Sequence, residues 1–518
     1  MPNPFTCDFD AFVDEARQRW RIPGIAFAIV DGDATYLKGY GDAQLDPKVA
    51  VDNDTLFFAA STTKAHLCAA WEIYIQSDTN KSKPKDVQIS WTTPISRIIP
   101  EDFVLSDGRT SQVTLEDCVS HRTGLAPHNL SYGFGGVRTA REIVRNMRHL
   151  PLRTELRSEW EYCNTPFVAA SHALEVVTGQ RLADFLRESF WGPAGMHSTY
   201  GGLGEATKAL KQHEKVLAKP TMSAEDPSDP DWDKAGLEET DYFDGDGILG
   251  AGWIITSVSD YAKYMRAWLH AESGPLTAEM IKELWKPRTV VPAGDIELLP
   301  VQGISAYALG WNITQHKEKK IVYHPGALFG AGSLVALLPE SKRGIAVFAN
   351  CQDASIRFSG MIAALIASLE DPAADLRKEA MKMDEPAIKL YQSTKEKFAT
   401  ASRGLYPDAL GNATVPHALP LVAYAGAYQN AGYGRMTLVA GANGDALIWH
   451  MTDRHWNGKI TLTHVNAEHW LAVLTGLSPF AKAPLKARSE IGFDGKVCAW
   501  LIATERSMPE TMIRFERV

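Results

Sequence analysis

Strand-like segments lie at both ends of the first 370 residues, and helix-like segments fill the stretch between them. Residues 25–41 hold two runs typical of β-strands around the turn Asp31-Gly32-Asp33, which is the pattern of a β-hairpin. Residues 321–350 hold three further strand-like runs, whereas the central residues show the spacing of amphipathic helices. This order predicts an α+β domain over residues 1–370, with one antiparallel sheet from the terminal strands and a helical subdomain between them.

Three later or inserted segments differ in composition from that domain. Residues 203–246 are dense in Lys, Glu, Asp and Pro, so we expect a long surface loop that could act as a lid. Residues 371–415 are charged with little apolar surface and predict a helical linker. Residues 416–518 hold short alternating runs punctuated by Gly and Asn, which predict an all-β domain, most simply a small barrel.

Composition and charge exclude several classes of protein. A chain of 518 residues is too long for one core, and its net charge of −9 argues against a nucleic-acid binder. The sequence contains no apolar run near membrane-spanning length, and its first residues lack the pattern of a secretory signal. Six scattered cysteines without a Cys-x-x-Cys pair suit a reducing compartment, so we expect a cytoplasmic protein without membrane contact.

The segment Ser61-Thr62-Thr63-Lys64 opens an apolar, helix-like stretch and places Lys64 one turn from Ser61. A serine hydroxyl becomes a nucleophile when a neighbouring base takes its proton and when N–H groups face the developing oxyanion. The spacing alone is weak, because it recurs at Ser82 and Lys85 in a charged, Pro-containing loop. A capping serine with a surface lysine is the alternative interpretation of any single match.

Two further short motifs follow downstream, Tyr162-Cys163-Asn164 and His324-Pro325-Gly326-Ala327. Together with Ser61–Lys64, in this order, they resemble the serine β-lactamase and penicillin-binding-protein superfamily, in particular its class C β-lactamase-like esterases, D-peptidases and transesterases. The supporting stretches are Gly39-Tyr40-Gly41, Ser120 to Leu125, Gly195 to Thr199, Gly250 to Trp253 and Leu309-Gly310-Trp311. The resemblance covers about residues 10–370, and the C-terminal domain resembles the lipocalin-like domains of some family members.

The resemblance implies a role for each matching residue. Ser61 would be the acylated nucleophile, and Lys64 or Tyr162 would serve as its base. The backbone N–H groups of Ser61 and Ala327 would form the oxyanion hole, which Gly326 allows because it has no side chain. The residues expected to contact substrate are Asn164, which could instead bind Lys64, and His324, Gly326, Trp253 and Phe329.

One departure from the family pattern bears on the substrate. Where β-lactamases carry Lys-Thr-Gly, this chain carries His324-Pro325-Gly326, so the hydroxyl that helps to hold a substrate carboxylate is missing. We therefore expect an ester, lactone, thioester or amide of a small molecule rather than a β-lactam.

Three functions stay open at this point. The first is a serine hydrolase with an acyl-Ser61 intermediate, and the second is an acyltransferase that passes the acyl group to an alcohol or amine. The third is a non-catalytic scaffold related to penicillin-binding proteins. We expect no cofactor and no metal, since the histidines of the C-terminal domain lack zinc-site spacing, and a homodimer is possible.

Overall fold

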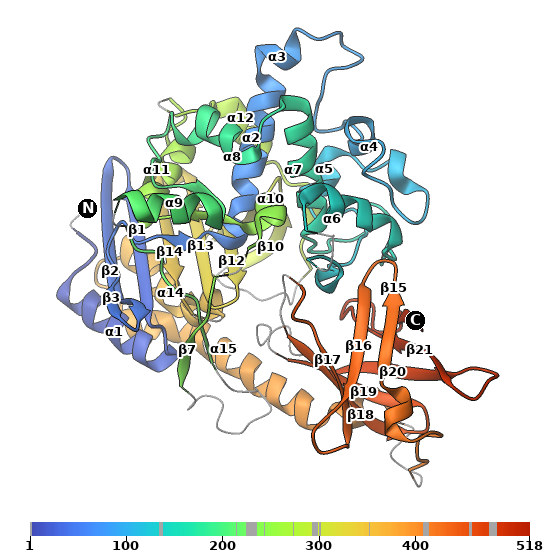
Figure 1. Ribbon diagram of the computed structural model, residues 1–518. Helices are drawn as coiled ribbons and strands as arrows, with labels where there is room; N and C mark the ends of the chain where they lie inside the picture. Colours follow the sequence, from blue (N-terminus) through green and yellow to red (C-terminus); the bar gives the residue numbers. More distant parts are fainter. Residues whose placement is uncertain are drawn as a thin grey trace.

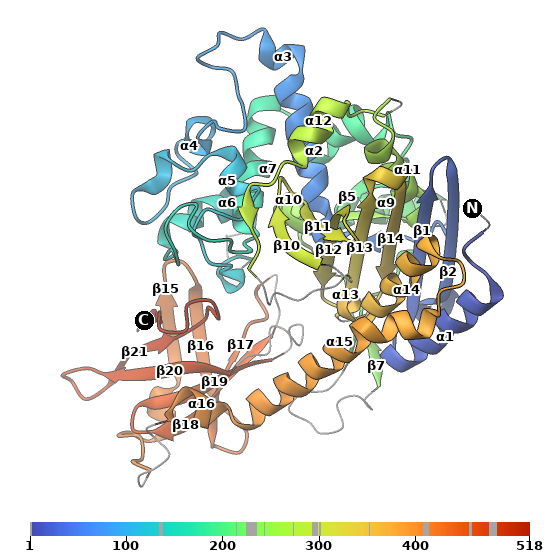
Figure 2. The ribbon, with the colours of Figure 1, turned by 180° about the vertical axis from the view of Figure 1, so that it is seen from behind.

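The computed structural model describes residues 3–133, 138–213, 215–223, 236–242, 244–272, 274–292, 299, 302–351, 353–407, 414–454, 458–475 and 484–518. A nine-stranded antiparallel sheet in the order β3-β2-β1-β14-β13-β12-β11-β10-β9 organises the first part of the chain (Figures 1 and 2). Its strands are β1 (Gly24–Asp31), β2 (Ala34–Leu45), β3 (Lys48–Ala50), β9 (Thr289–Val290), β10 (Gln302–Tyr307), β11 (Asn312–His316), β12 (Lys319–Leu328), β13 (Ala331–Leu338) and β14 (Arg343–Ala349). The predicted joining of the two ends of the domain is confirmed, because β1 pairs with β14.

Helices cover both faces of this sheet, which explains why its central strands are apolar throughout. Alternate residues of a strand point to opposite faces, so a strand buried on both sides has no polar face. In β1, Phe27 packs toward α1 (Cys7–Trp20), α14 (Ser359–Glu370) and α15 (Leu376–Ala399). Its neighbour Ala28 belongs to the other core, with α2 (Thr63–Gln76) and α11 (Val258–Leu269).

The central residues form the predicted helical subdomain beside the sheet (Figure 1). Thr114 begins one of its helices with a capping box to Asp117. Besides α7 (Thr165–Thr178), the domain has the shorter helices α3 (Asp78–Lys81), α4 (Ile95–Ile98), α5 (Leu115–Cys118), α6 (Ala140–Asn146), α8 (Leu182–Leu186), α10 (Leu249–Gly252), α12 (Ala278–Leu284) and α13 (Ala354–Arg357). Among the described residues, no helix is both long and apolar enough to cross a membrane.

The segment expected as a surface loop, residues 203–246, carries secondary structure of its own. It contains α9 (Leu203–His213) and a hairpin of β6 (Thr221–Ser223) and β7 (Leu237–Glu239). Leu217 is buried, and its carbonyl accepts a hydrogen bond from the Tyr242 hydroxyl at 2.7 Å. Residues 214, 224–235 and 243 lie outside the described residues, so a lid function stays a prediction.

The segment expected as a linker, residues 371–415, differs from that prediction at its start. The long helix α15 packs against the sheet domain through Leu376, Ala380, Met383 and Ala387, which are all buried. The Trp20 indole donates a hydrogen bond to Asp384 at 3.2 Å. The sequence does not show this apolar stripe clearly, because charged residues are dense along most of the segment. Beyond it, α15 runs toward the C-terminal domain, followed by α16 (Ala401–Leu405) (Figure 2).

The C-terminal residues form a closed eight-stranded antiparallel barrel, which confirms the predicted all-β domain. Its strands are β15 (Gly426–Asn430), β16 (Gly434–Ala440), β17 (Ala446–His450), β18 (Lys459–Asn466), β19 (His469–Thr475), β20 (Pro484–Ile491), β21 (Val497–Ile502) and β22 (Ile513–Arg517). Large side chains fill the interior, with Trp449, Trp470, Trp500 and Phe515 at most 2% exposed. The barrel is therefore a packed core.

Buried polar contacts join the barrel to the helical subdomain. Arg454 donates hydrogen bonds to the carbonyls of Leu130 and Tyr433, at 2.5 and 2.7 Å. The His128 ring contacts the Tyr433 hydroxyl at 2.6 Å. The Asn146 amide donates to the Gly432 carbonyl at 2.9 Å. These polar groups are buried and hydrogen-bonded to each other instead of to water. Separating the two domains would break these hydrogen bonds and expose the groups to water.

Candidate active site

A strained turn presents Ser61 at the start of α2. The short strand β4 (Phe57–Phe58) pairs with β8 (Ile254–Thr256), and the next N–H group, that of Ala59, donates to the Ile254 carbonyl at 2.8 Å. Ala60 follows with φ +50°, a left-handed conformation that is uncommon for a residue with a Cβ. Ser61 then lies in a 3₁₀ turn (Ala60–Thr62), and α2 begins two residues later than the sequence suggests.

Lys64 reaches back to Ser61, as the one-turn spacing predicts. Its Nζ atom lies 3.1 Å from Ser61 Oγ, 2.8 Å from Asn164 Oδ1 and 2.7 Å from the carbonyl oxygen of Ala251. The side chain is fully buried, and this burial lowers the pKa of the Lys64 amine to about 7. A large share of Lys64 is therefore neutral near neutral pH.

The partners of Lys64 fix the direction of its lone pair. The Ala251 carbonyl can only accept hydrogen bonds, and so can Asn164 Oδ1. A neutral amine has two N–H groups, and these two acceptors use both of them. The remaining lone pair then points at the third partner, the Ser61 hydroxyl, which is the arrangement of a general base beside its nucleophile.

Tyr162 contacts both Ser61 and Lys64. Its hydroxyl hydrogen-bonds with Ser61, and Lys64 Nζ lies 4.9 Å from the centre of its ring. Burial raises the pKa of the Tyr162 phenol above its ordinary value, although the hydrogen bond to Ser61 acts in the opposite direction. Tyr162 is therefore a neutral phenol at neutral pH. This difference in pKa favours Lys64 as the base in the resting protein.

The loop that carries Tyr162 is held by contacts on both sides. His121 Nδ1 accepts a hydrogen bond from the Cys163 N–H at 3.1 Å, and the His121 carbonyl accepts from the Glu161 N–H at 2.8 Å. The Cys163 thiol is 1% exposed and burial raises its pKa, so it does not offer a competing nucleophile.

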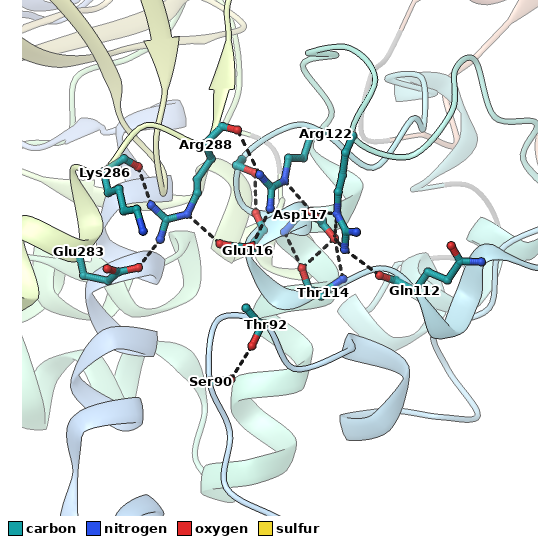
Figure 3. A network of polar contacts seen from close by, with 12 residues as sticks. Ser90, Thr92, Gln112, Thr114, Glu116, Asp117, Arg122, Glu283, Lys286 and Arg288 are labelled. Carbon is teal, nitrogen blue, oxygen red and sulfur yellow. Dashed lines mark hydrogen bonds and ion pairs between the residues drawn. The ribbon is translucent and has the colours of Figure 1, made fainter.

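A network of ion pairs around Asp117 and Glu116 holds the start of this loop (Figure 3). Asp117 is completely buried and accepts hydrogen bonds from Arg122 at 2.6 Å and from Arg157 at 2.7 Å. Arg157 precedes Tyr162 in the same loop, so the network ties that loop to α5. Glu116 extends the network to Arg288, at 2.8 Å, next to β9.

The strand β12 passes close to the Ser61 turn at Gly326. An added Cβ at Gly326 would lie 2.7 Å from the Ala59 carbonyl oxygen and 2.9 Å from Ala60 Cβ, so only glycine fits without displacement. The last pair between β11 and β12 is Asn312 with Tyr323. Within the described residues, β12 therefore extends from His324 onward without a strand on its β11 side. Ala327 is exposed in this extension, one residue beyond the contact with the turn.

His324 is buried, which differs from the substrate contact that the sequence predicts. It is 1% exposed, and its Nδ1 lies 2.6 Å from the Pro325 carbonyl, which can only accept a hydrogen bond. The proton therefore sits on Nδ1, and Nε2 accepts from the Tyr307 hydroxyl at 2.8 Å. Burial lowers the pKa of the His324 ring to about 3, so the ring is neutral. Both ring nitrogens of His324 are therefore used in hydrogen bonds within the protein.

The two aromatic residues expected around the substrate lie in unlike places. Trp253 has no exposed surface and packs against Phe58, with their ring centres 5.9 Å apart. It therefore supports the turn from inside the core, which differs from the predicted place in the pocket wall. Phe329 is half-buried in the turn between β12 and β13, two residues beyond Ala327.

The competing sequence matches stay away from this site. Ser82 and Lys85 are both exposed in the loop after α3. The sequence Tyr428-Gln429-Asn430 repeats the spacing of Tyr162 and Asn164, but Tyr428 is buried in the barrel, where its hydroxyl donates to the Tyr424 carbonyl at 2.8 Å.

Sequence reasoning missed two groups that the structure places in the site. The Ala251 carbonyl is a backbone acceptor, and no side-chain motif marks such a group. Tyr307 orients His324 from β10, a strand whose polar residues gave no strand-like run. A search for residues facing the His-Pro-Gly motif across the sheet would be needed to find it.

Comparison with known proteins agrees with this geometry. The model of the family described as "Beta-lactamase" matches residues 9–368. The chain is 33% identical over 499 residues to an unguisins hydrolase of Aspergillus campestris, covering 95% of this chain and 88% of that protein.

Solved structures also share the fold. The octameric penicillin-binding protein homologue from Pyrococcus abyssi matches with a TM-score of 0.59 and 17% identity, covering 98% of this chain and 99% of that one. The D-amino acid amidase from Ochrobactrum anthropi SV3 matches with a TM-score of 0.54 and 22% identity, covering 73% and 98%. On the family match and the unguisins hydrolase relative together, this chain belongs to the beta-lactamase family.

Proposed function

We propose that this beta-lactamase-family hydrolase cleaves an ester or amide bond of a small molecule through an acyl-Ser61 intermediate. The observation that carries the proposal is the set of contacts of Lys64. Its two acceptor-only partners and its lowered pKa leave a lone pair directed at Ser61 Oγ, 3.1 Å away. A merely structural buried lysine would have no need of a serine partner at the start of a helix.

In the acylation step, Ser61 Oγ attacks the carbonyl carbon while its proton passes to Lys64 Nζ. The carbonyl oxygen becomes an oxyanion that the backbone N–H groups of Ser61 and Ala327 stabilise. When the intermediate collapses, the leaving group takes the phenolic proton of Tyr162. Tyr162 is then reprotonated by Lys64, which returns to the neutral amine.

In the second step, water attacks the acyl-enzyme and the same groups act in reverse roles. Lys64 takes a proton of the water, and Ser61 recovers its own as it leaves the acyl carbon. The Asn164 side chain accepts from Lys64 through Oδ1. Its amide N–H groups are then the part available to donate to a substrate carbonyl.

Two observations support the choice of substrate class. Pro325 replaces a hydroxyl-bearing residue, so a β-lactam carboxylate loses one of its hydrogen bonds. The relative with 33% identity is named an unguisins hydrolase, which makes unguisins the first compounds to test.

Intact-mass measurement tests the proposal. Wild type and Ser61→Ala are each incubated with a 4-nitrophenyl ester, with a penicillin and with unguisins. We expect ester-derived acylation or turnover in wild type alone, with slow reaction of the penicillin. An adduct that disappears only after an alcohol is added would assign acyl transfer instead of hydrolysis. Equal behaviour of the two proteins would refute the role of Ser61.

A further inference from the structure

A chain of buried hydrogen bonds runs from the interior of the helical subdomain to the Ser61 turn. The Trp191 indole nitrogen lies 3.2 Å from His66 Nδ1, and His66 Nε2 lies 3.2 Å from the Tyr261 hydroxyl. The Tyr261 hydroxyl lies 2.5 Å from Thr62 Oγ1, which in turn lies 2.8 Å from the Ala59 carbonyl oxygen. All five residues are fully buried.

The two ends of the chain fix the direction of every hydrogen bond in it. An indole N–H can only donate, so His66 Nδ1 accepts and the ring proton sits on Nε2. His66 therefore donates to Tyr261, Tyr261 donates to Thr62, and Thr62 donates to the Ala59 carbonyl, which can only accept. Burial lowers the pKa of His66 to about 3, so the ring stays neutral and the direction of the chain does not change with pH in the working range.

The chain ends at a carbonyl that connects both halves of the oxyanion hole. The Ala59 carbonyl precedes the strained Ala60 and also accepts from Ser333 Oγ on β13, at 2.5 Å. Gly326 of β12 lies against the same carbonyl, since its added Cβ would be 2.7 Å away. The position of this oxygen therefore sets the gap between the Ser61 turn and β12.

We propose that Tyr261 is a positioning residue that acts through Thr62 on the Ala59 carbonyl. It thereby sets the distance between the two oxyanion donors, the N–H groups of Ser61 and Ala327. This inference rests on the proposed acyl transfer at Ser61. It adds residues that contact neither the substrate nor the nucleophile's hydroxyl.

The two donors of the oxyanion hole belong to different elements, a turn before α2 and a strand of the sheet. A shift of either element changes their separation, whereas substrate binding elsewhere in the site stays the same. Losing the Tyr261 hydroxyl would leave Thr62 Oγ1 with one hydrogen bond fewer and would relax its hold on the carbonyl. Transition-state stabilisation should then fall, while affinity for the ground state should not.

The test compares Tyr261→Phe with Tyr264→Phe, a matched control on the same helix. Tyr264 is also buried and stacks on His66 with ring centres 4.0 Å apart, but its hydroxyl takes no part in the chain. Each variant is assayed for its single-turnover acylation rate with a 4-nitrophenyl ester, its substrate affinity, its melting temperature and its inhibition by an arylboronic acid.

We expect Tyr261→Phe to slow acylation by about tenfold, the effect of one buried hydrogen bond, and to weaken boronate binding by the same factor. Substrate affinity should stay within about twofold, and Tyr264→Phe should acylate like wild type. A general packing defect would lower the melting temperature without a matching loss of boronate affinity. Wild-type acylation by Tyr261→Phe would overturn the inference.

A double-mutant cycle with Thr62→Val checks the proposed route. Valine keeps the shape of threonine and removes its hydroxyl. Because Tyr261 acts only through that hydroxyl, the double variant should acylate no more slowly than Thr62→Val alone. Fully additive losses would show that Tyr261 acts by another route. If wild type and Ser61→Ala react alike, the proposed function fails, and this outcome is distinct from a failure of the positioning role.

Discussion

Replacing Gly326 by alanine tests how closely β12 must approach the nucleophile. The new Cβ would lie 2.2 Å from Ser333 Oγ, 2.7 Å from the Ala59 carbonyl oxygen and 2.9 Å from Ala60 Cβ. Ser333 can rotate away, but it then releases the Ala59 carbonyl. The carbonyl itself belongs to the backbone, so β12 must move outward instead.

The size of the effect follows from that movement. Restoring ordinary contact with the Ala59 carbonyl, from 2.7 to 3.4 Å, requires a displacement of about 0.7 Å, which would carry the Ala327 N–H away from the proposed oxyanion site. Loss of one oxyanion-hole donor slows catalysis by about 10²–10³-fold. We therefore expect Gly326→Ala to acylate about 100-fold more slowly than wild type, with little change in substrate affinity.

Stopped-flow release of 4-nitrophenol measures the acylation rate directly, and thermal unfolding shows whether the variant is folded. Gly252→Ala is the matched control, because its added Cβ also lies near Ser61 but comes no closer than 3.5 Å to any atom beyond its own helix backbone and chain neighbours. The control should acylate at close to the wild-type rate. If both variants react like wild type, the placement of the oxyanion hole between the Ser61 turn and β12 is refuted.

Three further predictions concern pH, the Tyr162 loop and the barrel. Because burial lowers the pKa of Lys64 to about 7, kcat/KM should fall about tenfold per pH unit below 7 and level off above about 8; a flat profile from pH 5 to 8 would contradict Lys64 as base. Asp117→Asn should lower the free energy of unfolding by about 3 kcal/mol, since it leaves Arg122 beside a buried neutral group, and urea denaturation measures this. Arg454→Met should lower the free energy of unfolding by about 2–4 kcal/mol and speed proteolysis between the two domains. The control Arg435→Met, at an exposed position, should change neither quantity.

The parts of the site that the sequence could predict are those set by local geometry. Ser61 and Lys64 are one turn apart on one helix, so their contact follows from spacing. The strands that bracket the domain are strongly apolar because both sheet faces are covered, and this is why the hairpin and β12–β14 were visible. β10 and β11, toward one end of the sheet, carry more polar residues and gave no such apolar run.

Other features depend on tertiary packing that residue type does not reveal. Trp253 and Phe329 are both aromatic residues near a motif, yet one is a core residue and the other is half-buried at a turn. The use of both His324 nitrogens depends on Tyr307, which lies across the sheet. The hydrogen bonds that link the Tyr261 hydroxyl through Thr62 to the Ala59 carbonyl connect segments far apart in the chain. No sequence motif contains both segments, so only the folded structure could show the link.

The pairing of β1 with β14 has a consequence for the folding of this protein during its synthesis on the ribosome. β1 emerges early and pairs with β2 on one side, but its neighbour on the other side, β14, follows roughly 300 residues later, which takes about 15–60 s at ordinary translation rates. Until then the edge of β1 that pairs with β14 stays open, and an apolar run such as Ile25 to Val30 beside an open edge invites chaperone binding. The proposed oxyanion hole also needs the Ala327 N–H group, which is synthesised long after Ser61. Activity should therefore arise only after β14 has been synthesised and the sheet has closed.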